Sequence, residues 1–321
     1  MGDQEEKPKS FSDHGYLACS TGRQRRPGGL KAATFGPSLS TIPRIFVRMH
    51  PSLKLNLAHQ LGIAQKLTEF VDANFLGWQN ISDARKGLIL MALADKSFVT
   101  FRAIRHLLQD SLFVDDASAL VRVQYECIVS ALFVFYSPYP VPDDYADYFM
   151  YRHWYDHLQV AARDAKTAAN ALPPEVLAGM EADYNKAKDR YSALNGNWTN
   201  KNLRDKAVFV DSKMPPGFKT FAWLYETIYR PCSAWVHSDV RSIQSRVRQL
   251  ADGTPEIHRE VTPDEGARFM HAANFLMLAI SFPIAAEFYG NKLIEPWNII
   301  VREWSGLSAD DPSAKMPIVR E

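Results

Sequence analysis

Residues 120–135 read LVRVQYECIVSALFVF, and this stretch decides the fold. Its residues are apolar nearly all round, interrupted by only a few polar side chains. A helix that is apolar on every side is usually buried on every side. We therefore predict a central buried helix that starts at Asp115-Asp116 and ends at Tyr136, where three closely spaced prolines follow.

Helical patterning continues on both sides of this central helix. After Pro51 apolar residues recur at three- and four-residue spacing, and no segment alternates convincingly as a strand would. Thr262-Pro263-Asp264-Glu265 is a well-formed helix start, with Thr as N-cap, Pro first and Glu third. We predict an all-α fold, a bundle of about seven helices. The predicted helices span residues 53–78, 82–112, 115–136, 143–170, 173–194, 218–250 and 262–289, and a short helix spans 296–305.

The first fifty residues have a different composition. Serine, glycine, proline and charged residues dominate there, and neither a helical nor a strand period holds. Arg23, Arg25 and Arg26 form a basic cluster, but three arginines favour a solvated tail over a nucleic-acid site. We predict a disordered tail over residues 1–50, an all-helical domain over 51–307 and a flexible tail over 308–321.

Composition excludes several broad classes of protein. The formal net charge of the 321-residue chain is +1, so no overall field favours nucleic acid or a membrane. The three cysteines are far apart and form no CxxC pair, which fits a reducing compartment without a disulfide scaffold. The longest charge-free apolar stretch, residues 272–286, is too short to span a membrane and contains Pro283. We expect a cytoplasmic protein without a membrane partner and without a cofactor.

The central helix nevertheless carries two charged residues, Arg122 and Glu126, one turn apart on one face. Burying charges costs free energy unless they are paired. One interpretation is a structural ion pair that also ties neighbouring helices together. The other is a polar centre inside the bundle, where ionisable groups are often tuned for chemistry. The residues alone leave both interpretations open.

The helix predicted over residues 218–250 supplies a complementary polar stripe. His237 is the member of that stripe whose ordinary pKa lies near neutrality. The stripe either faces water or faces Arg122 and Glu126. Pro231 is expected to remove one helical hydrogen bond and to kink the helix. The stripe consists of Glu226, Arg230, Ser233, His237 and Arg241.

A weaker candidate is the pair His153 and His157, whose one-turn spacing could bind a metal ion. The zincin glutamate is missing from this segment, and no third ligand is evident nearby. We therefore predict surface histidines and no metal site. A nucleophile elbow, a P-loop and a Rossmann glycine fingerprint are also missing from the sequence.

Two helical segments carry a resemblance to a known family. Residues 117–126 read ASALVRVQYE and follow a helix that contains Lys96 and the segment 103–107, AIRHL. Residues 229–237 read YRPCSAWVH. Together they resemble the bacterial domain of unknown function 5677 family, over a core of about residues 60–290. The resemblance implies a helical fold, whereas the function of that family is unsettled.

A looser similarity is to HEPN proteins, helical bundles that include RNases of toxin and antiviral systems. Their pattern is an arginine, then four to six intervening residues, then a histidine. Six residues separate Arg230 from His237 here, although Pro231 stands where a polar residue usually follows the arginine. This similarity implies a homodimer that cleaves RNA without metal, with His237 moving protons and Arg230 holding the phosphate. Supporting roles would fall to Arg122, Glu126, Tyr229, Ser233 and Arg241.

Two predictions of function follow. The first is a non-enzymatic regulatory or interaction module, in a defence or stress response, in which Arg122, Glu126 and His237 form a structural network. The alternative is the HEPN-like RNase. The sequence identifies no further partner.

Overall fold

The computed structural model describes residues 56–75, 84–109, 113–163, 173–192, 194, 197–214, 218–236, 247–257, 263–289 and 292–306. All of them belong to one unit, Val47–Glu321. The predicted all-α class is confirmed, and the predictions for the tails over 1–50 and 308–321 lie outside the described residues. The described helices are α1 (Leu57–Asn74), α2 (Ala84–Leu108), α3 (Val114–Tyr136), α4 (Val141–Arg163), α6 (Pro174–Ser192), α7 (Leu203–Lys213), α8 (Phe221–Leu224), the π-helix η5 (Tyr225–Tyr229), α9 (Arg230–Val236), α11 (Pro263–Tyr289) and α12 (Ile294–Ser305).

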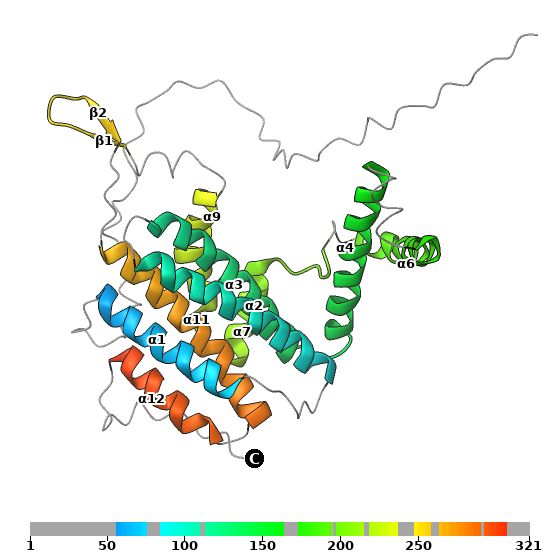
Figure 1. Ribbon diagram of the computed structural model, residues 1–321, viewed down its shortest axis with the longest axis horizontal. Helices are drawn as coiled ribbons and strands as arrows, with labels where there is room; N and C mark the ends of the chain where they lie inside the picture. The colour runs from blue at the N-terminus through cyan, green and yellow to red at the C-terminus, as the bar shows by residue number, and fades with distance from the viewer. Residues whose placement is uncertain are drawn as a thin grey trace, which may run out of the picture. The chain divides into compact units, whose positions relative to one another are not determined.

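Helix α3 lies in the core, as its apolar pattern predicts. From Ala117 to Tyr136 every residue is buried or half-buried. Helices α2, α7, α9 and α11 pack against it, and α1 and α12 pack against α11 and against each other (Figure 1). The side chains of Val121, Ile128 and Leu132 are fully buried among these helices. The polar residues of α3 that matter below are therefore held by a close-packed scaffold.

Buried polar side chains fasten α11 to α1. The amide of Asn274 donates to the backbone oxygen of Gln60 at 2.9 Å and to its side-chain oxygen at 3.0 Å. Nδ1 of His271 lies 3.2 Å from the same side-chain oxygen. The ring of His271 also stacks on Trp304 of α12, with ring centres 4.6 Å apart. Because buried polar groups need partners, these contacts set the register of three helices.

Helices α3 and α11 are both long and apolar enough to cross a membrane, so the expectation that residues 272–286 are too short for a span does not hold for the whole of α11. Within the fold, 61% of the most apolar window of α3 and 83% of that of α11 are buried, as in a core helix. Length and composition alone do not separate these two cases. The expectation of a cytoplasmic protein without a membrane partner therefore stays a prediction.

Helices α4 and α6 pack on each other through tyrosines. Tyr151 of α4 stacks on Tyr184 of α6 with ring centres 5.2 Å apart, and Tyr148 meets Tyr191 edge-on at 5.2 Å. An ion pair between Arg190 of α6 and Asp144 of α4 adds to this contact. The face of α4 that carries Tyr148, Tyr151 and Tyr155 thus packs on α6.

The helix predicted over residues 218–250 is wrong at its C-terminal end. Strand β1 (Val247–Gln249) pairs antiparallel with β2 (Pro255–Ile257), with Val247 opposite Ile257. The turn between them contains Gly253 at a φ of 85°, and the amide of Thr254 donates to the Asp252 carboxylate at 2.9 Å. Asp-Gly is a strong turn signal because glycine adopts positive φ without steric cost. The prediction of a helix over residues 218–250 did not take this turn signal into account.

Helix α7 lies between residues 194 and 218, where no helix was predicted. Its start is capped by Asn202, whose side-chain oxygen accepts from the backbone N–H of Asp205 at 2.9 Å. Asparagine is among the strongest N-cap residues. Ala207 and Val210, three residues apart, turn the buried face of this helix toward α3. The cap was visible in the sequence, but the helix spans only 11 residues and its apolar pattern is short.

The segment around Pro231 is continuous helix but contains a π-helical turn. The backbone N–H of Arg230 donates to the oxygen of Tyr225, five residues earlier. Pro231 has no N–H to continue this ladder, so the wider turn ends at the residue before it. Pro231 was expected to kink the helix. The irregularity that the structure shows is a widened, π-helical turn just before Pro231. Such π-turns occur frequently at functional sites.

Candidate functional site

The Arg122–Glu126 pair sits on the side of α3 that faces η5 and α9. Nη2 of Arg122 lies 3.0 Å from Oε1 of Glu126, one helical turn away. The Arg122 side chain is 19% exposed and that of Glu126 39%, so the pair lies at the edge of the core. A pair in this position is screened less than a surface pair and pays less desolvation than a buried one.

Tyr229 of η5 completes a three-residue network with this pair. Its hydroxyl donates to Oε1 of Glu126 at 2.6 Å and accepts from Nη2 of Arg122 at 3.3 Å. The guanidinium carbon of Arg122 also lies 5.2 Å from the centre of the Tyr229 ring. Burial, followed by the hydrogen bond to Glu126, raises the pKa of Tyr229 to about 12. The phenol is thus a hydrogen-bond donor at neutral pH.

Two further tyrosines hold Tyr229 in place. The ring of Tyr225 stacks on that of Tyr229 with centres 5.1 Å apart, and the ring of Tyr125 lies 5.4 Å away. The hydroxyl of Tyr125 donates to the backbone oxygen of Phe221 at 2.8 Å. These contacts bind α8 and η5 to α3, so the π-helical turn is part of the packed scaffold.

Lys206 of α7 is a site residue that sequence reasoning missed. It is only 8% exposed, and burial lowers its pKa to about 8 although the charge of Glu126 acts in the opposite direction. Its ammonium lies 4.2 Å from the ring centre of Trp198. A buried lysine near a carboxylate cannot be recognised from a sequence in which its helix was not predicted.

Arg230 pairs with Glu226, four residues earlier in the chain. Its guanidinium bonds Oε2 of Glu226 at 2.8 Å, and Arg204 of α7 bonds Oε1 of the same carboxylate at 3.0 Å. The Arg230 side chain is 60% exposed. These contacts, led by the hydrogen bond from Arg230, lower the pKa of Glu226. Two guanidinium groups share one carboxylate, so this exposed cluster keeps a net positive charge.

The other predicted site residues separate into two groups. Ser233 lies on α9 and is half-buried, whereas His237 and Arg241 lie outside the described residues. The neighbour of Ser233, Cys232, is buried against Ser118 of α3, and burial raises its thiol pKa to about 12. The structure thus brings Arg122, Glu126 and Tyr229 together, and it pairs Arg230 with Glu226.

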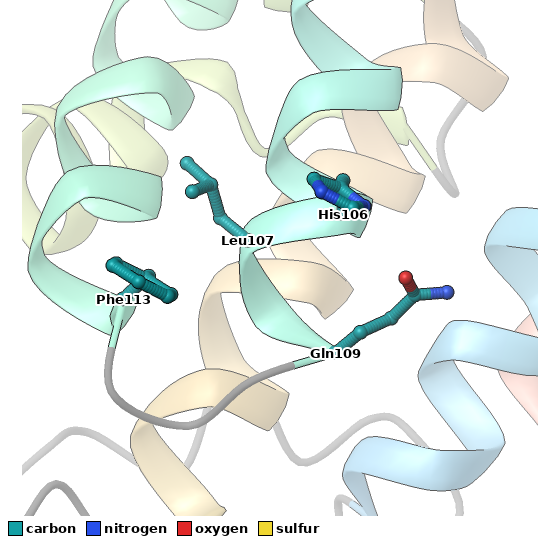
Figure 2. Close-up of a pocket in the computed structure, with 4 residues that line it drawn as sticks. All are labelled: His106, Leu107, Gln109 and Phe113. Carbon is teal, nitrogen blue, oxygen red and sulfur yellow. The ribbon is translucent and has the colours of Figure 1, made fainter.

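A hollow lies between the end of α2 and the start of α3. It is lined by His106, Leu107, Gln109 and Phe113 and has a volume of about 410 Å³. Figure 2 shows Leu107 between the two helices, whereas Gln109 points away from Phe113. Because its polar side chains do not converge, the hollow lacks the arrangement that small-molecule sites usually have. Among the predicted site residues that the structure describes, none lines it.

The fold and the network define an all-α protein in which a π-helical turn is fastened to the central helix by an Arg–Glu–Tyr network. A family model described as a family of unknown function (DUF5677) matches residues 87–254. The match covers more than half of the chain, including most of α2 and all of α3, α7 and η5, so the protein belongs to this family. The resemblance seen in the sequence is confirmed for the family, and the HEPN similarity stays a prediction.

Comparison with curated proteins found no match, and comparison with solved structures found none either.

Proposed function

We propose that the protein is a non-enzymatic regulatory or interaction module. The observation that carries this proposal is the use of the Tyr229 hydroxyl, which donates to Glu126 and accepts from Arg122. A hydroxyl that already donates one hydrogen bond and accepts another within the protein is a poor candidate for proton transfer to a substrate. The network then acts as a clamp that holds η5 on α3.

The clamp also positions an exposed surface. Glu226 belongs to the same π-helical turn as Tyr229 and gathers Arg204 and Arg230 on the solvent-facing side. Guanidinium groups are well suited to bind carboxylates or phosphates in a bidentate manner. A module with this surface would bind an acidic partner, with the clamp fixing the position of Glu226 and Arg230.

The HEPN-like RNase is the second candidate, and one observation favours it. Arg230 is 60% exposed, and α9 is helical up to Val236, the residue before His237. In that mechanism His237 would transfer protons and Arg230 would stabilise the developing phosphate charge.

One experiment separates the two candidates. The full-length protein is incubated with single-stranded RNA in the presence of a chelator, beside Arg230→Ala and His237→Ala. The non-enzymatic proposal expects intact RNA in all three samples. Cleavage by the wild type that is lost in both variants, with unchanged melting temperatures, would reject the proposal and support the RNase.

A further inference from the structure

Helix α4 has a second apolar face, opposite to the one that packs on α6. At 3.6 residues per turn, the residues of this second face fall on the side away from Tyr148, Tyr151 and Tyr155. Its apolar members are exposed: Phe149 by 64%, Met150 by 43% and Val160 by 53%. We call this face the outer stripe, and it consists of Phe149, Met150, His153, His157 and Val160.

Two histidines lie at the middle of the outer stripe, and their rings are placed much like two imidazole ligands of one metal ion. The rings of His153 and His157 have centres 4.4 Å apart and an interplanar angle of 77°. Two imidazoles on one tetrahedral Zn²⁺, with Zn–N bonds of about 2.1 Å, have ring centres roughly 5 Å apart. The observed separation therefore requires only a small rotation of the side chains to admit the ion.

A single chain supplies only half of such a site. Within the described part of the chain, no three His, Cys, Asp or Glu side chains gather into a group that could hold a metal ion. A structural zinc site has four protein ligands. The two missing ligands must therefore come from another chain.

The order of residues along the outer stripe fits a second copy of the same helix. Tyr155 lies halfway between His153 and His157, and also halfway between Met150 and Val160. An antiparallel pair of α4 helices, related by a two-fold axis that crosses the outer stripe at the level of residue 155, would place His153 opposite the second copy's His157. It would likewise place Met150 opposite the second copy's Val160. An isologous contact needs this self-complementary spacing.

Although the sequence alone predicts surface histidines and no metal site here, we propose that the outer stripe of α4 binds Zn²⁺ between two copies of the chain, through His153 and His157 of each copy. Four neutral imidazoles complete the tetrahedron, and the exposed apolar residues of the stripe are buried at the contact. The zinc site shares no residue with the Arg122–Glu126–Tyr229 clamp, so either proposal can fail without the other.

The test is the mass of the full-length chain in analytical ultracentrifugation, with Zn²⁺ or with a chelator. We expect a twofold increase in mass with Zn²⁺, one zinc ion bound for every two chains, and the monomer in chelator. His153→Ala and His157→Ala should each abolish the increase. His106→Ala, which removes an exposed histidine of α2, is the matched control and should dimerise like the wild type.

Val160→Glu keeps both imidazoles and places charge on the apolar part of the contact, so it should weaken the zinc-dependent dimer severalfold. Circular dichroism of each variant checks that helicity is kept. An equal mass of the wild type in zinc and in chelator would overturn the proposal. So would a His157→Ala variant that dimerises with zinc as the wild type does.

Discussion

The hydroxyl of Tyr229 lies 2.6 Å from Oε1 of Glu126 and donates a hydrogen bond from the π-helical turn η5 to the central helix α3. The two residues are 103 positions apart in the chain. This bond, together with the Arg122–Glu126 ion pair, closes the contact between the two segments that carry the family resemblance. The stability of that contact is open to direct measurement.

Removing the carboxylate of Glu126 should destabilise the protein. Glu126→Ala leaves Arg122, whose Nε is already buried without a hydrogen-bond partner among the described residues, without its counter-charge. Because the pair is half-exposed, we expect a loss of about 1–2 kcal/mol in the free energy of unfolding. Urea denaturation followed by circular dichroism measures it.

The matched control is Asp156→Ala, which breaks an Arg–acid pair of the same one-turn spacing on the solvent face of α4, where Asp156 is 68% exposed. That change should cost less than about 0.5 kcal/mol. Equal losses in the two variants would contradict a structural role for Glu126.

The Tyr229 hydroxyl should contribute separately from its ring. Tyr229→Phe keeps the stacking on Tyr225 and removes only the bonds to Glu126 and Arg122, so we expect a loss of about 1 kcal/mol. In a double-mutant cycle with Glu126→Ala, which removes the acceptor, the two losses should not add, because the side chains share one hydrogen bond. Strict additivity in the unfolding free energies would show that the bond contributes nothing.

Acid should destabilise the core through His271. Burial lowers the pKa of this histidine to about 3, so it is neutral in the folded protein, whereas the unfolded chain takes up a proton below about pH 6.5. The unfolded state then binds more protons, and stability falls as the pH drops below 6.5. Between about pH 7.5 and pH 5 this histidine alone should remove about 2 kcal/mol.

Urea denaturation at the two pH values, for the wild type and for His271→Asn, isolates this effect from the titration of carboxylates. Asparagine keeps a donor toward Gln60 and cannot take up a proton. The loss on acidification should be smaller in the variant by about the same 2 kcal/mol. An identical loss in both proteins would exclude His271 as the cause.

The buried charge of Lys206 should lower the free energy of unfolding, compared with a neutral residue at the same position. Its folded pKa of about 8 lies below the ordinary value of 10.5, so the unfolded chain binds the proton more tightly between these two values. The free energy of unfolding therefore rises as the pH increases from 8 to 10.5, and the cost is fully present at pH 7. Lys206→Met should stabilise the protein at pH 7 by about 1–2 kcal/mol, with a smaller gain at pH 10.

Lys213→Met is the control, because Lys213 is an exposed residue at the end of the same helix. It should change the unfolding free energy by less than about 0.5 kcal/mol. A destabilising Lys206→Met would show that the contacts of the ammonium with Trp198 and the field of Glu126 outweigh desolvation.

Local patterns in the sequence were sufficient for most of the fold. The all-round apolar run of α3 and the apolar spacing after Pro51 predicted buried and amphipathic helices that the structure contains. The Arg122–Glu126 pair was equally visible, because one-turn spacing is a property of the helix itself. These signals succeed because they depend on neighbours within a few residues.

Other features depended on the tertiary structure. The partnership of Tyr229 with Glu126 joins segments far apart in the chain, and no spacing rule selects one tyrosine of the thirteen for it. The burial of Lys206 is decided by α3 and Trp198 around it. The strand conformation of residues 247–249, predicted as helix, depends on their pairing with β2 across an Asp-Gly turn. Burial and long-range pairing arise only when segments far apart in the chain pack together. The local pattern therefore predicts which residues form a helix, whereas the packing decides a residue's partner, its pKa and its exposure.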